Sequence, residues 1–226
     1  GPLRMALKII TTKQAVSQNG IKVLVHGPAG AGKTRLCATA GDLASTLIIS
    51  AESGLLSLRE HTIDVAEVAS LDDAREAYRM LAGGQHKYKW VCLDSISEIA
   101  EVVLAHEKKQ TKDPRQAYGA LQEAMFQLLK SFRDLPLNVY MSCKQQRDED
   151  GRFLPSLPGS KLAQGIGYLF DEVFALQTQR DDQGVVRRAL LCRDDPRYEV
   201  KDRSGALNAL EPADLSAIAA KIRGGK

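Results

Sequence analysis

The glycine-rich octapeptide at residues 27–34 constrains the fold of this chain more than any other stretch of its sequence. It follows an apolar run at 21–25 and precedes a helix-compatible stretch at 35–40, so a strand and a helix meet at a G-x-x-x-x-G-K-T loop. Glycines let successive backbone N–H groups face a phosphate without an intervening Cβ, and the start of a helix adds its positive dipole end. Lys33 can reach the β- and γ-phosphates of a nucleotide, and the Thr34 hydroxyl can ligate Mg²⁺. The match at all four fixed positions disfavours a chance glycine turn. We therefore predict a nucleoside triphosphate site formed by Gly27, Pro28, Ala29, Gly30, Ala31, Gly32, Lys33, Thr34 and Arg35.

The composition indicates a globular protein with an ordinary core. The chain has 226 residues, of which 44% are hydrophobic and 26% charged, and this length suggests one domain with at most a small appendage. The net charge of +3 is too small to argue for nucleic acid by itself. The four cysteines form no C-x-x-C pair, so we expect buried free thiols in a reducing cytosol. We find no membrane span or signal peptide, and we expect a cytoplasmic protein without a membrane partner.

The sequence divides into three segments. Residues 1–4, which precede Met5, are typical of a scar left by cleavage of an expression tag. Residues 5–20 are polar and too short for a domain, and we expect an N-terminal arm suited to contact a neighbouring subunit. Residues 21–226 form the predicted core domain.

Alternating strand and helix patterns predict an α/β fold. Strand patterns occupy 21–25, 46–50, 63–68, 88–94 and 137–142, and a β-hairpin pattern covers 170–179 and 185–192. Helix patterns occupy about 70–82, 95–109, 118–132 and 212–223, and we expect loops at 108–115 and 143–161. This succession predicts a mostly parallel central sheet flanked by helices on both faces, with a late hairpin and a ligand at the carboxyl ends of the strands. Gly27, Glu52, Asp94 and Ser142 should lie at those ends.

The carboxylates at these ends suggest a hydrolytic site. Asp94 ends an apolar strand where a P-loop enzyme needs a Mg²⁺ ligand; the competing interpretation is a helix N-cap, and the two are compatible. Ser95, rather than a glutamate, follows Asp94, so the group that activates water must come from elsewhere. Glu52 is the favoured candidate, because we expect its strand to lie beside the P-loop strand. Glu98 is the alternative, and an exposed loop carboxylate is the competing interpretation of Glu52.

Several segments resemble the RecA-like recombinase core over most of residues 18–210. Ser50-Ala51-Glu52 resembles its catalytic-glutamate segment, and Val91-Cys92-Leu93-Asp94-Ser95 resembles its metal strand. The segments at about 107–117 and 145–161 fall where RecA proteins carry DNA-binding loops, and Val200-Lys201-Asp202-Arg203 resembles the segment that reaches a neighbour's γ-phosphate. Residues 157–162, 169–173 and 201–205 are more specifically similar to phage-encoded, core-only relatives described as single-strand annealing proteins.

The resemblance implies an ATPase that requires Mg²⁺ and works slowly, in an oligomer on single-stranded DNA. It implies a ring or filament in which Lys201 and Arg203 act in trans on a neighbouring subunit. It implies that the reaction is DNA annealing or homologous recombination. It also implies a location in the cytoplasm of a bacterial host, with a single-stranded-DNA-binding protein as a further partner. The alternative for Lys201 and Arg203 is a solvated basic pair. The chain departs from the family at Ser142 and Cys143, where an Asn-Gln pair that senses the γ-phosphate is common, so we expect coupling to DNA binding either to be weaker or to use Lys144. The 226 residues of the chain do not cover the extra terminal domains of full-length RecA, so we do not expect full strand-exchange activity from them.

Basic residues in the two expected loops are the DNA-binding candidates. Lys108, Lys109, Lys112 and Arg115 lie in the first loop, and Arg147 and Arg152 lie in the second beside three acidic residues. Solvated loops are the competing interpretation. Two other functions stay open: a small-molecule P-loop kinase, and a nucleotide-gated oligomerising module with little hydrolysis.

Overall fold

Strand β1 (Lys22–Gly27) leads into the glycine loop and lies inside a single sheet of the computed structural model, which describes residues 6–51 and 55–224. The sheet order is β10-β8-β7-β1-β5-β4-β2-β3, with β6 paired to β5 and β9 paired to β7. The six strands from β7 to β3 in this order are parallel, and β6, β8, β9 and β10 run antiparallel to their neighbours. Their bounds are β2 (Thr46–Ser50), β3 (Asp64–Glu67), β4 (Trp90–Leu93), β5 (Asn138–Arg147), β6 (Phe153–Ser156), β7 (Glu172–Arg180), β8 (Val186–Leu191), β9 (Lys201–Asp202) and β10 (Leu210–Pro212).

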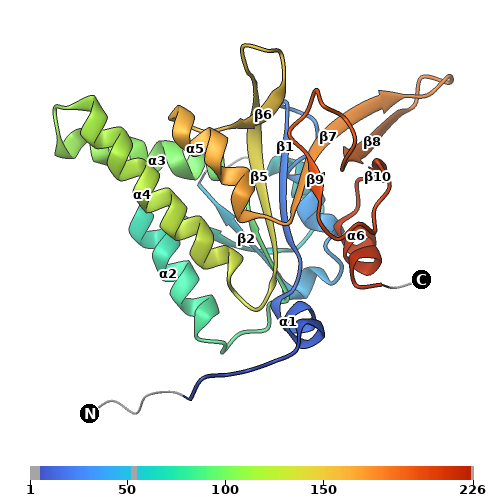
Figure 1. Cartoon of the computed structure of the whole chain (residues 1–226), viewed down its shortest axis with the longest axis horizontal. Helices are drawn as coiled ribbons and strands as arrows, with labels where there is room; N and C mark the ends of the chain where they lie inside the picture. Colours follow the sequence, from blue (N-terminus) through green and yellow to red (C-terminus); the bar gives the residue numbers. More distant parts are fainter. Residues whose placement is uncertain (1–5, 52–54, 225–226) are drawn as a thin grey trace.

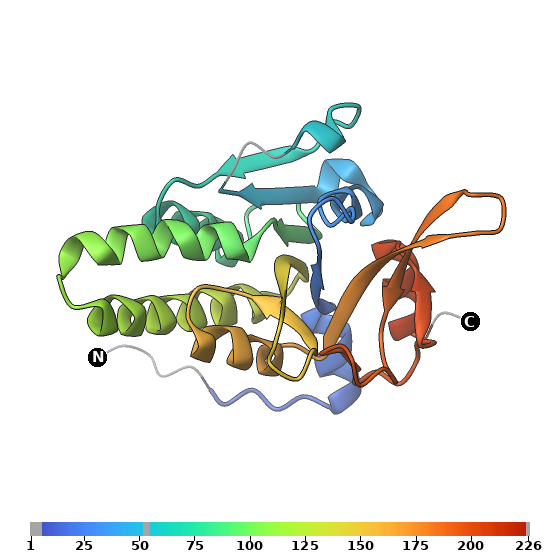
Figure 2. The same ribbon diagram turned by 90° about the horizontal axis from the view of Figure 1, so that it is seen from above.

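Both faces of the sheet are covered. Helices α2 (Leu71–Ala82), α3 (Ile96–Gln110), α4 (Pro114–Arg133) and α5 (Ser160–Gly165) pack on one face, and α3 and α4 form a long helical hairpin (Figures 1 and 2). The 3₁₀ helix η1 (Arg35–Thr39) and α6 (Leu215–Ile222) cover the other face, and α1 (Thr12–Asn19) precedes β1. Alternate residues of β1 enter the two cores: Leu24 packs under the α-helices, and Val23 and Val25 pack on the other side. The predicted mostly parallel α/β sheet is confirmed, and so is the late hairpin, formed by β7 and β8.

Local sequence signals explain several helix boundaries. Ser70 accepts a hydrogen bond from the backbone N–H of Asp73 and caps α2 (3.1 Å), as the sequence indicates. In α4 the predicted apolar stripe is buried at Leu121, Met125, Leu128 and Phe132. Its first predicted member, Tyr118, is instead 38% exposed. Within residues 6–51 and 55–224, no helix has both the length and the apolar character that a bilayer crossing requires.

The prediction of a loop over 108–115 is wrong. Lys108 and Lys109 belong to the last turn of α3, Arg115 belongs to the first turn of α4, and Lys112 lies in the three-residue connection. Pro114 begins α4 instead of interrupting the chain, because proline fits the first helical position and the Asp113 side chain caps the helix by accepting from the N–H of Arg115.

The prediction of a long loop over 143–161 is also wrong. Strand β5 continues to Arg147 and pairs with β6 in a hairpin, with Lys144 opposite Ser156. The Asp148 carboxylate closes the turn by accepting from the backbone N–H groups of Asp150 and Arg152. The polar composition that suggested a loop reflects exposure of this outer part of β5. Ser142 consequently lies inside β5 and not at a strand end.

Two further expectations need correction. The helix after the glycine loop is η1, a 3₁₀ helix of five residues, so it is shorter than the pattern suggests. Strand β2, which precedes Glu52, does not lie beside β1, since β5 and β4 intervene. Glu52 itself and residues 1–5 fall outside the described residues.

Candidate functional site

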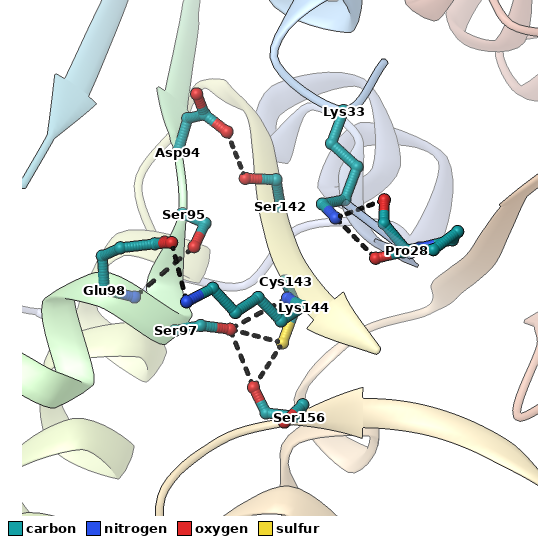
Figure 3. Close-up of polar contacts among 11 residues, drawn as sticks. Pro28, Lys33, Asp94, Ser95, Ser97, Glu98, Ser142, Cys143, Lys144 and Ser156 are labelled. Carbon is teal, nitrogen blue, oxygen red and sulfur yellow. Dashed lines mark hydrogen bonds and ion pairs between the residues drawn. The ribbon is translucent and has the colours of Figure 1, made fainter. Parts of the chain in front are cut away.

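The glycine loop and the ends of β4 and β5 enclose a cavity of about 360 Å³. Glycine is required at two loop positions, because Gly30 and Gly32 have φ values of 75° and 103°. The Lys33 ammonium folds back onto the loop and donates to the carbonyl oxygens of Gly27 (2.5 Å) and Pro28 (3.1 Å) (Figure 3). Burial lowers the pKa of Lys33 below its ordinary value. The cavity is lined by Gly27, Pro28, Ala29, Lys33, Thr34, Ser50, Asp94, Ser95, Glu98, Lys144 and Gln145.

The two predicted metal ligands meet inside this cavity. The Thr34 hydroxyl donates to Asp94 Oδ2 at 2.8 Å, although the two residues are sixty positions apart. The Ser142 hydroxyl from β5 donates to Asp94 Oδ1 at 2.5 Å (Figure 3). Ser95, and not Asp94, is the N-cap of α3, so the carboxylate of Asp94 faces the two hydroxyls. Hard oxygen donors of this kind fit Mg²⁺, which takes few protein ligands and completes its shell with phosphate and water. Within the described residues, no group of three or more His, Cys, Asp or Glu side chains is arranged to hold a metal ion by itself.

Glu98, the alternative candidate for activating water, also lines the cavity. Its Oε1 pairs with the Lys144 ammonium at 3.2 Å (Figure 3), whereas Oε2 is buried without a hydrogen-bond partner in the described structure. Glu98 is thus placed beside the glycine loop and Asp94, where a carboxylate can orient a water molecule next to a phosphate. The same ion pair holds Lys144, one of the two sensor alternatives, at the wall of the cavity.

Distant residues that the sequence does not single out support the loop. The hydroxyl of Tyr140 donates to the Lys33 carbonyl oxygen (2.6 Å) from a fully buried position in β5. Arg188 Nε from β8 donates to the Ala31 carbonyl oxygen at 2.9 Å. No local motif marks either residue, because each reaches the loop only through the strand order.

The hairpin β5–β6 is tied to α3 beside the cavity. The Ser97 hydroxyl donates to the Ser156 carbonyl oxygen (2.7 Å) and accepts from the Lys144 backbone N–H (2.9 Å). Figure 3 shows Ser97, Cys143 and Ser156 next to the Glu98–Lys144 pair. The Cys143 thiol is buried, which raises its pKa to about 12, so it stays protonated at neutral pH. All four cysteines are buried and free, as expected.

The other predicted site residues lie away from this cavity. Arg35 is exposed on η1 and is not among the lining residues. Lys201 borders a separate cavity of about 390 Å³, and Arg203 pairs with Asp171 at 3.3 Å. Within one chain, therefore, neither Lys201 nor Arg203 lines the cavity at the glycine loop.

The DNA-binding candidates form two separate exposed groups. Lys108, Lys109, Lys112 and Arg115 surround the tip of the α3–α4 hairpin, where the Lys108 ammonium lies 5.7 Å from the ring centroid of Tyr118. Arg147 and Arg152 flank the β5–β6 turn.

The family comparison agrees with this geometry. A family model described as an AAA domain matches residues 19–204, which include the glycine loop, Asp94 and the β5–β6 hairpin. No curated protein matches the chain.

Proposed function

The chain belongs to this AAA domain family of P-loop nucleoside triphosphatases, and from that premise we propose that it is an ATP- and Mg²⁺-dependent protein that assembles on single-stranded DNA and promotes annealing or homologous recombination. The observation that carries the nucleotide part is the contact between Thr34 and Asp94 under the glycine loop, within a cavity that also holds Lys33. A hydroxyl, a carboxylate and an ammonium are thus placed around one volume suited to a triphosphate.

The residues of the cavity have separate roles in the proposed ATP hydrolysis. The Lys33 ammonium exchanges its two loop carbonyls for phosphate oxygens, and backbone N–H groups of the glycine loop bind the phosphates. Thr34 and Asp94 are the residues that would hold Mg²⁺, and the ion would supply neutralisation of phosphate charge during ATP cleavage. Glu52 is the favoured candidate to accept the proton of the attacking water, and Glu98, which lines the cavity, is the alternative.

We propose that DNA contacts the tip of the α3–α4 hairpin. Four cations, Lys108, Lys109, Lys112 and Arg115, gather there against two acids, Glu107 and Asp113. These four side chains are exposed, so their positive charges can contact the phosphates of a DNA backbone. The β5–β6 turn is the weaker candidate for DNA contact, because three acidic residues offset the charges of Arg147 and Arg152 there.

We further propose a homo-oligomer with ATP at the subunit junctions. Lys201 and Arg203 lie outside the cavity of their own chain, and this position suits action on a neighbour's nucleotide in a ring or filament. A single-stranded-DNA-binding protein is a further proposed partner.

One experiment tests these proposals together. ATP turnover is measured with and without single-stranded DNA, while light scattering records the mass in solution, for the wild type, Lys33→Ala and a variant with Lys108, Lys109, Lys112 and Arg115 replaced by Glu. We expect DNA to stimulate turnover and raise the mass in the wild type and in neither of these two variants. A matched control, Arg75→Glu with Arg79→Glu on exposed positions of α2, should behave as the wild type. Phosphate transfer to a small acceptor without a DNA effect would instead indicate a kinase. Oligomerisation without turnover would indicate a nucleotide-gated module, and ATP-stimulated DNA binding by Lys33→Ala would refute the site.

A further inference from the structure

His26, the residue directly before the glycine loop, is fully buried and has no part in the nucleotide site described above. Its ring uses both nitrogens. Nε2 lies 2.7 Å from the Glu199 carbonyl oxygen, and Nδ1 lies 3.0 Å from Gln145 Nε2. The two partners come from distant parts of the chain, β5 and the segment before β9.

The chemistry of the partners fixes the proton on the ring. The amide nitrogen of Gln145 can only donate, so Nδ1 must accept, and Nε2 must carry the hydrogen that it donates to the Glu199 carbonyl. Burial is the main cause that lowers the pKa of His26 to about 4; Lys33 and Arg152 act in the same direction and the hydrogen bond to Glu199 opposes them, so the ring is neutral at physiological pH. His26 is therefore a directional link, accepting from one side and donating to the other.

On one side, the link begins at the nucleotide cavity. Gln145 lines that cavity, and its amide is also the group that His26 binds. A phosphate entering the cavity can compete for this amide, since an oxyanion is a stronger acceptor than a neutral imidazole.

On the other side, the link ends at a unit formed by strand β6 and residues 197–199. The Glu199 N–H donates to the Phe153 carbonyl (2.8 Å), and the Phe153 N–H donates to the Arg197 carbonyl (2.7 Å). The rings of Phe153 and Tyr198 stack at 4.9 Å between centroids, and Lys201 follows two residues after Glu199. Glu199 is thus joined by backbone hydrogen bonds to the β5–β6 hairpin and by two peptide links to Lys201.

We propose that His26 is a positioning residue that couples occupancy of the nucleotide cavity, through Gln145, to the placement of residues 197–201 and the β5–β6 hairpin. The coupling rests on the proposed nucleotide binding but not on DNA binding. It assigns to the buried His26 side chain the task of transmitting the nucleotide state to the proposed trans-acting segment.

Hydrogen–deuterium exchange with and without Mg²⁺ and ATP tests this inference. In the wild type, we expect ATP to change exchange at least twofold in peptides covering 145–156 and 197–203. His26→Leu should bind ATP within about threefold of the wild type, measured by calorimetry, and lose the change at 197–203. His26→Gln should restore it, because an amide can accept from Gln145 and donate to Glu199. If His26→Leu does not fold, as judged by thermal unfolding, His26→Asn replaces it, since its shorter side chain can reach only one of the two partners.

The outcomes separate the two proposals. A retained ATP response in His26→Leu, or in its Asn replacement, overturns the coupling and leaves nucleotide binding intact. The same conclusion follows if the wild type binds ATP without any change at 197–203. A wild type that binds no ATP overturns both proposals.

Discussion

Replacing Asp94 by asparagine separates metal binding from folding at the nucleotide site. The carboxylate accepts from two hydroxyls, those of Thr34 (2.8 Å) and Ser142 (2.5 Å). Hydrogen bonds to a charged acceptor contribute about 1.5–3 kcal/mol and neutral ones about 0.5–1.5 kcal/mol. The asparagine retains an acceptor oxygen, and either hydroxyl can rotate to accept from its NH₂ group. The substitution also removes the desolvation cost of a charge, so we expect the free energy of unfolding to change by no more than about 1 kcal/mol.

The effect on Mg²⁺-dependent binding should be larger. Asp94 is the carboxylate that lies beside Thr34 in the cavity, and loss of its charge should weaken Mg·ATP binding about 10- to 100-fold, or about 1.4–2.7 kcal/mol. ATP binding in the presence of EDTA should stay the same or tighten, because the carboxylate repels an uncompensated triphosphate.

Calorimetric titration of ATP with Mg²⁺ and with EDTA measures both affinities, and chemical unfolding checks the fold. The matched control is Asp64→Asn, because Asp64 is also hydrogen-bonded to a hydroxyl, that of Tyr88 at 2.6 Å, but lies on edge strand β3 outside the cavity. The control should change neither affinity. An equal loss with Mg²⁺ and with EDTA in Asp94→Asn would show that Asp94 shapes the loop and does not hold the metal.

Three further predictions concern stability and support of the loop. Gly20→Ala should lower the free energy of unfolding, measured with denaturant, by about 2–4 kcal/mol, because Gly20 has φ 70° and ψ −174° and the new Cβ would lie 2.5 Å from a backbone oxygen. Gly84→Ala, at φ 77° with open space around it, should lower it by less, and equal losses would refute the clash. Burial, and then a hydrogen bond to a neighbouring carboxyl group, raises the pKa of Glu172 from 4.5 to about 9. The folded protein thus keeps a proton that the unfolded chain releases, and stability falls as pH rises from about 4.5 to 9, by up to about 1.4 kcal/mol per pH unit. Glu172→Gln should flatten this slope between pH 6 and 8 in unfolding titrations, and an unchanged slope would contradict the assignment. Tyr140→Phe removes the hydroxyl that donates to the Lys33 carbonyl oxygen. The free energy of unfolding should fall by about 1–2 kcal/mol, and ATP affinity, measured by calorimetry, should fall by up to about tenfold. Unchanged values for both would show that this hydrogen bond does not support the loop.

Short-range patterns were sufficient for the parts of the fold and site that depend on neighbours in sequence. The glycine loop, the carboxylate after β4 and the Ser70 cap each require only a few adjacent residues of defined chemistry. The same patterns misread Pro114 and the outer half of β5, because a proline can begin a helix as well as interrupt one, and a polar strand resembles a loop.

The strand order was decided by tertiary structure alone. It inserts β5 between β1 and β4, and this insertion brings Ser142 to Asp94, Tyr140 to the Lys33 carbonyl and Gln145 to His26. The same order separates β2 from β1, contrary to the expectation for Glu52. Which strands become neighbours depends on burying two apolar faces under the helices at once, a long-range packing condition that no local stretch of sequence encodes. The sequence by itself thus determined which groups of the P-loop could bind a nucleotide, and the packing of the sheet determined which distant side chains stand beside them.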